Sequence, residues 1–106
     1  MVFQSWPISF EPAVRREVSP PVAVIVDLSI GIARGQVSFA NEVPLRVRAE
    51  GLQLDIKTPG RLCAWARTSR GDWLGRCQVR VPAGHGGYLE LDQWFPAAAI
   101  TPTAEM

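Results

Sequence analysis

The sequence predicts an all-β fold: a small antiparallel β-barrel of six to seven strands with an extended amino-terminal arm and a carboxy-terminal 3₁₀ turn. Short runs of β-branched and aromatic residues alternate with glycine and proline, and no helix of normal length is predicted. Two segments can also each fold into a hairpin. The chain of 106 residues, of which 47% are hydrophobic and 20% charged, suits one domain with its own core.

We expect residues 1–21 to form an extended arm, because prolines interrupt this segment and exclude a regular helix or central strand. The arm carries aromatic residues that could anchor it across a barrel, namely Phe3, Trp6 and Phe10. Residues 22–102 then form the single barrel domain, and residues 103–106 a disordered tail. The barrel begins with the β-branched run Val22 to Leu28 (VAVIVDL), which predicts a buried central strand.

After a glycine-punctuated loop, a short strand is predicted over Gln36 to Ala40, and a hairpin over Val43 to Lys57. The apolar residues of the hairpin fall at odd positions before Glu50-Gly51 and at even positions after it. A two-residue turn at Glu50-Gly51 would therefore pair the two arms consistently on both faces, with Val47 opposite Leu54.

The most specific local signal is a second hairpin, over Leu62 to Val81 (LCAWARTSRGDWLGRCQVRV). Its loop consists of residues 69–71 and places Gly71 where such loops need a left-handed backbone. The register of this loop sets Arg67 opposite Trp73, so that Arg67 either forms an intramolecular cation–π pair with this ring or is available to contact nucleic acid.

The segment Tyr88 to Phe95 is predicted to be the next strand and to pair with the second arm of this hairpin. The pairing that matches the apolar faces also places Glu90 opposite Arg80, and Asp92 close to Arg76. Surface ion pairs are therefore expected on the polar face of this strand pair.

Residues 43–102 resemble the small barrels of the SH3 type. The resemblance rests on a GDW tripeptide that enters a strand, on the loop that follows, and on a strand that ends in WFPAAAI. It implies the order of strand, proline, 3₁₀ turn and closing strand that such domains have. The acidic loop and exposed tyrosines with which SH3 domains hold proline-rich peptides are not recognisable in the sequence, so the resemblance implies topology only.

The two cysteines, Cys63 and Cys77, face each other in the predicted hairpin register, which allows either a cross-strand disulfide or two buried thiols. Together with the only histidine, His85, they lack the short ligand spacing of zinc sites, so we expect no metal and no other cofactor. His85 lies among glycines, and no nucleophile or metalloprotease motif is present. The sequence therefore predicts that the protein is not an enzyme.

The formal net charge of +1 gives no global attraction to nucleic acid or to an anionic membrane surface. No apolar run reaches the length of about 20 residues that a membrane-spanning helix needs. The amino terminus also lacks the charged and apolar regions of a secretory signal. We therefore expect a cytoplasmic protein without a membrane partner.

By elimination, the sequence favours a non-enzymatic interaction module that binds a protein partner or self-associates. The residues expected to contact the partner are aromatic or arginine residues: Arg70, Trp73, Tyr88 and Trp94. The alternative is a barrel that binds nucleic acid, because the second hairpin interleaves arginines with tryptophans. In that alternative the contact residues are Arg61, Trp65, Arg67 and Arg70.

Overall fold

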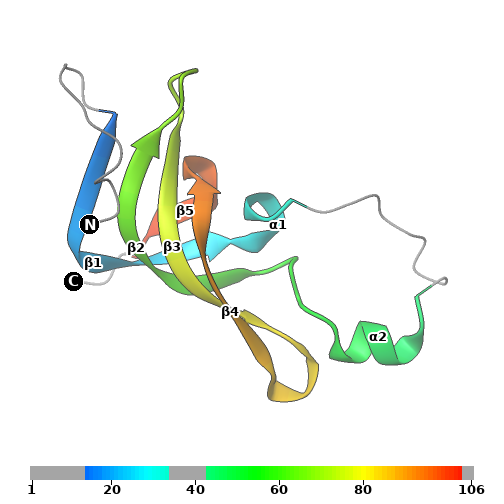
Figure 1. Ribbon diagram of the computed structural model, residues 1–106. Coiled ribbons are helices and arrows are strands. Elements are labelled where there is room, and N and C mark those ends of the chain that lie inside the picture. The colour runs from blue at the N-terminus through cyan, green and yellow to red at the C-terminus, as the bar shows by residue number, and fades with distance from the viewer. Residues whose placement is uncertain (1–13, 34–42, 104–106) are drawn as a thin grey trace.

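The computed structural model describes residues 14–33 and 43–103 of the chain. Its main element is an antiparallel sheet of five strands in the order β4-β3-β2-β1-β5, and Figure 1 shows that this sheet curls into a half-barrel. The strands are β1 (Arg15–Asp27), β2 (Lys57–Arg67), β3 (Trp73–Pro82), β4 (Tyr88–Pro96) and β5 (Ile100–Pro102). The helical elements are α1 (Leu28–Gly31), α2 (Leu45–Glu50) and the 3₁₀ turns η2 (Gly84–Gly86) and η3 (Ala97–Ala99).

The antiparallel β fold and the carboxy-terminal 3₁₀ turn are confirmed, but the described residues hold five strands instead of six to seven. The expected strand Gln36–Ala40 and the aromatic anchors of the arm lie outside the described residues. Residues 15–21, which the sequence assigns to the arm, form the first part of β1. Pro20 and Pro21 fit into this strand because the β1–β2 ladder is interrupted between Glu17 and Val22. Proline has no backbone N–H, and at this interruption β2 does not require one.

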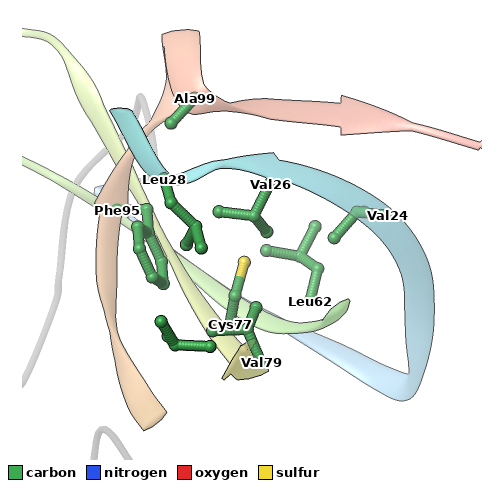
Figure 2. Packing of buried hydrophobic residues seen from close by; sticks show 9 residues of the cluster. Val24, Val26, Leu28, Leu62, Cys77, Val79, Phe95 and Ala99 are labelled. Carbon is green, nitrogen blue, oxygen red and sulfur yellow. The ribbon is translucent and has the colours of Figure 1, made fainter. Parts of the chain in front are cut away.

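The core lies on the inner face of the half-barrel. β1 has β2 on one side and β5 on the other, which confirms its predicted central position, although only alternate side chains such as Val24 and Val26 are buried. Figure 2 shows Leu28, Phe95 and Cys77 side by side in this interior. The buried cluster consists of Val24, Val26, Leu28, Leu62, Cys77, Val79, Val81, Phe95 and Ala99. Each large apolar side chain in it contributes about 1.5–3 kcal/mol through removal from water.

The tip of the β2–β3 hairpin follows the predicted register. Arg67 lies opposite Trp73, and Trp65 lies opposite Gly75. Gly71 has a φ of 102°, the left-handed conformation that the loop needs, and its N–H donates to the carbonyl of Thr68 over 2.9 Å. Local turn chemistry therefore determines this part of the sheet.

The predicted pairing of Cys63 with Cys77 is wrong, because β2 contains one extra residue at this point. Leu62 pairs with Cys77 and Ala64 pairs with Arg76, which leaves Cys63 as a β-bulge. The β1–β2 ladder is interrupted at the same level of the sheet. Irregularities on both sides of β2 increase the local twist and bend the sheet toward a barrel.

The pairing of β3 with β4 follows the predicted register along its whole length. Arg80 lies opposite Glu90, with 3.5 Å between Nε and Oε2. Arg76 donates two hydrogen bonds to the Asp92 carboxylate, from Nε over 2.9 Å and from Nη2 over 2.8 Å. Both ion pairs expected from the sequence are present.

The predicted hairpin over Val43 to Lys57 is wrong, since its first arm is the helix α2. Pro44 precedes a run of good helix formers, and the N–H of Gly51 closes the helix by donating to the carbonyl of Val47 over 2.8 Å. The second arm pairs elsewhere: Leu52 forms a bridge with Ala83 at the end of β3. The backbone N–H and C=O groups that would join the two arms of the predicted hairpin are therefore hydrogen-bonded within α2 or to the end of β3, as from the N–H of Gln53 to the carbonyl of Pro82.

Candidate functional site

The two faces of the sheet have different chemistry. Along β3, the buried residues Gly75, Cys77, Val79 and Val81 alternate with the more exposed Arg76, Gln78 and Arg80. Trp73 has the same parity as the buried set and therefore lies on the inner face, beyond the core, near the hairpin tip. Trp94 pairs with Arg76 and lies on the outer face. The inner face thus changes along β3 from a closed core to an open aromatic surface.

A hollow of about 410 Å³ lies on this aromatic surface, and we call it the tryptophan groove. Its described lining consists of Arg16, Trp65, Trp73 and Ala97. The two indole rings are half-buried and meet edge to face, with centroids 6.5 Å apart and planes at 85°. The lining residues come from β1, β2, β3 and the η3 turn, so the groove depends on the assembled fold.

Gly75 allows Trp65 to lie across the sheet. A Cβ at Gly75 would lie 3.1 Å from Cζ3 of Trp65, 2.9 Å from Cδ1 of Leu62 and 2.5 Å from Cδ1 of Ile100. The Trp65 ring therefore covers the place where β3 has no side chain. Leu62 and Trp65 are three residues apart, and in a regular strand they would point to opposite faces. Both contact Gly75 because the bulge at Cys63 lies between them.

Arg67 stabilises the position of the Trp73 ring, which forms the wall of the groove nearest to the hairpin tip. Its guanidinium carbon lies 5.5 Å from the centroid of the Trp73 ring, and its Nε donates to the carbonyl of Gly71 over 2.9 Å. The cation–π pair, one of the two alternatives for Arg67, is therefore present. At the loop itself, the Thr68 hydroxyl donates to the Asp72 carboxylate, and this hydrogen bond holds the pKa of Asp72 below its usual range. Arg70 is exposed at the outermost turn of the hairpin.

The outer face carries a second, larger hollow of about 890 Å³ between β2, β3 and β4. Its walls contain cations and anions together, including Arg61, Arg80, Glu90 and Asp92. The hydrogen bonds from Arg76 hold the pKa of the Asp92 carboxyl below its usual range. Arg80 lies 4.5 Å from the centroid of the Tyr88 ring, so this arginine contacts both an acid and an aromatic ring. Most charge on this face is neutralised locally.

The structure separates both predicted contact sets. Of the four residues expected to contact a protein, Trp73 lies on the inner face, Tyr88 and Trp94 lie on the outer face, and Arg70 lies at the hairpin tip. Of the four expected to contact nucleic acid, three lie at or near the tip of the β2–β3 hairpin: Trp65, Arg67 and Arg70. Arg61 pairs with Gln78 and belongs to the outer face.

Sequence reasoning missed Arg16 and Ala97 as groove residues. Arg16 reaches the groove because it pairs with Trp65 across the β1–β2 ladder. Nothing local in the sequence indicates this register, since the two residues are far apart in the chain. Ala97 follows Pro96, which pairs with Leu74, so the predicted strand and turn could have placed it near the hairpin tip.

The two cysteines are free and lie in different environments. Cys77 is fully buried, and burial raises the pKa of its thiol to about 12. Cys63 is half-buried at the bulge, and its thiol donates weakly to the carbonyl of Arg61 over 3.8 Å. His85 does not approach the cysteines: its Nε2 lies 3.6 Å from Oε2 of Glu50. Among the described residues, no group of three or more His, Cys, Asp or Glu side chains could hold a metal ion.

No protein family model, no curated protein and no solved structure matches this chain. Within residues 14–33 and 43–103, none of the helices has the length and apolar character that crossing a membrane would require.

Proposed function

We propose that this protein is a non-enzymatic interaction module that binds an extended segment of a protein partner in the tryptophan groove. One observation carries the proposal: Trp65 and Trp73 border a hollow of about 410 Å³ on the same face as the core, but outside it. Half-buried tryptophans offer a large apolar area at little conformational cost, and such residues dominate the binding energy of protein interfaces. Narrow aromatic grooves on small barrels also suit extended peptides.

We also propose an SH3-like barrel as the finer description of the half-barrel. The strand order and the 3₁₀ turn η3 between β4 and β5 support this proposal, together with the GDW and WFPAAAI motifs. The proposed function does not depend on it, because the groove is defined by its own residues.

Nucleic acid is the less favoured ligand. Single-strand binding needs arginines beside the aromatic rings that are available to phosphates. Arg76 and Arg80 are in ion pairs on the outer face, and Arg61 lies on that face too. Arg67 borders the groove, but its Nε is bonded to the Gly71 carbonyl. The basic side chains at the groove itself are therefore Arg16 and Arg67, fewer than the charged channel that follows a nucleic-acid backbone requires.

The test is selection of ligands from a random library of extended peptides displayed on phage, followed by titration of the selected peptides against Trp73→Ala and Trp94→Ala. Trp94 is the matched control, because it is a half-buried tryptophan on the opposite face. We expect Trp73→Ala to raise the Kd by about tenfold or more and Trp94→Ala to leave it unchanged. A failure to select any peptide would refute the proposal, as would equal losses in the two variants.

A single-stranded oligonucleotide of mixed sequence, titrated at several salt concentrations, tests the alternative. Strong binding at low salt that weakens steeply with added salt would favour nucleic acid as the ligand. Sedimentation without peptide tests self-association, since a concentration-dependent dimer that Trp73→Ala dissociates would identify a second copy of this chain as the partner.

A further inference from the structure

Among the residues that the structure describes, the charged side chains around the tryptophan groove are all basic. Arg16 lines the groove and is exposed, and Arg67 lies over its Trp73 wall. Among the described residues, neither arginine forms a salt bridge. The lining contains no carboxylate among the described residues. The rim is therefore basic although the chain as a whole is nearly neutral.

Two described acidic residues are chain neighbours of groove residues, and neither faces the groove. Glu17 follows Arg16 in β1 and pairs with Ala64, so its side chain points to the other face of the sheet. Asp72 is at the hairpin loop and accepts a hydrogen bond from Thr68. Neither carboxylate neutralises the basic rim.

The two arginines lie beside different rings of the aromatic pair, Arg16 beside Trp65 and Arg67 beside Trp73. Arg16 is the β1 neighbour of Trp65, whereas Arg67 lies two residues further along β2. Strand spacing and rise per residue place the two arginine backbones on the order of 8 Å apart. A bound extended segment that covers the indole rings would therefore bring its neighbouring side chains within reach of a guanidinium. Arginine recognises a carboxylate through two parallel hydrogen bonds, which are stronger beside an apolar surface than in open solvent.

We propose that the tryptophan groove selects extended apolar segments of a partner protein that carry an aspartate or glutamate, and that Arg16 provides this selectivity. The inference rests on the proposed function and goes beyond it by naming the charge of the ligand. It commits the groove to an acidic partner segment instead of a neutral or basic one. Arg16 acts as the specificity residue, and the two tryptophans supply the affinity that all extended segments share.

The experiment compares peptides that differ only at one position, where Glu, Gln or Lys is flanked by proline and leucine. Kd values are measured by calorimetry with the full chain. We expect the Glu peptide to bind about fivefold more tightly than the Gln peptide, because the ion pair is partly exposed, and the Lys peptide to bind most weakly. The preference should shrink as salt is added.

Arg16→Glu should reverse this order, and Arg16→Gln should remove the preference while the Gln peptide keeps its affinity. Arg61→Glu is the matched control, because it changes the net charge equally but lies on the outer face. Equal binding of the three peptides would overturn the charge selectivity and leave the proposed function in place. An equal effect of Arg61→Glu would show long-range attraction instead of contact and would also overturn it. If no peptide binds the wild-type chain, the proposed function itself is wrong.

Discussion

The bulge at Cys63 leads to a prediction about thiol chemistry, because it places the two cysteines in unequal environments. In the register expected from the sequence they would face each other and share one environment. In the structure Cys77 pairs with Leu62 and is fully buried, whereas Cys63 is half-buried. We therefore predict that an alkylating reagent modifies Cys63 in the folded protein and spares Cys77.

The difference in alkylation rate between the two cysteines follows first from the pKa of Cys77. The thiolate is the reactive form, and burial raises this pKa from 9.0 to about 12. At mildly alkaline pH, that change lowers the thiolate fraction about a thousandfold. The reagent also cannot reach Cys77 in the folded protein, because none of this side chain touches solvent, and this lowers its alkylation rate further. Its modification therefore requires local or global opening of the core.

The assay is a time course with iodoacetamide, stopped with excess thiol and resolved by mass spectrometry of the two cysteine peptides. Cys63 should be modified at least about a hundredfold faster than Cys77, and denaturant should make the two rates similar. Cys63→Ala provides the control, because its remaining thiol should resist modification until the protein unfolds. Similar rates in the native protein, or a Cys63–Cys77 disulfide after non-reducing digestion, would refute the bulged register.

Further predictions concern α2, the outer face and the bulge. A Cβ at Gly84 would lie 1.7 Å from the carbonyl oxygen of Ala49, so Gly84→Ala should detach α2 and speed its amide hydrogen exchange by about tenfold or more. Asp92→Asn should cost less than about 1 kcal/mol above pH 5, because its ion pair is on the surface. The lowered pKa of Asp92 stabilises the fold above the unfolded pKa, and this stabilisation is lost as pH falls through the folded pKa, so urea titrations of the variant should show a weaker acid dependence. Deletion of Cys63 should remove only the extra residue and leave Leu62 and Trp65 on the inner face of a regular β2–β3 ladder, so the variant should keep its peptide binding; a folded deletion variant that loses peptide binding would contradict our account of the bulge.

The sequence predicts the parts of this fold that depend on near neighbours. Gly71 determines the hairpin loop, and the loop fixes the register as far as Trp65. The register of β4 was also predictable, because its apolar and charged faces match those of β3 in only one alignment, with Glu90 opposite Arg80.

The failures have identifiable physical causes. The bulge at Cys63 accompanies an irregularity in β1, a strand far away in the chain, and no local pattern indicates it. The segment after Pro44 alternates like a strand but has high helix propensity, and its three apolar positions are too few to decide between the two. The groove could be predicted only in part, because Trp65 and Trp73 are hairpin neighbours whereas Arg16 reaches them through a long-range pairing.

The bulge also explains how one strand can serve both the core and the groove. Before Cys63, β2 places Leu62 in the core, and after it the same strand places Trp65 on the same face. If Cys63 instead occupied a regular, paired position in the ladder, strand alternation would turn Trp65 to the outer face, among the ion pairs of β3 and β4. The core alone therefore does not fix the position of the groove. Groove residues on the far side of the bulge can therefore change while Leu62 keeps its packing in the core of the half-barrel.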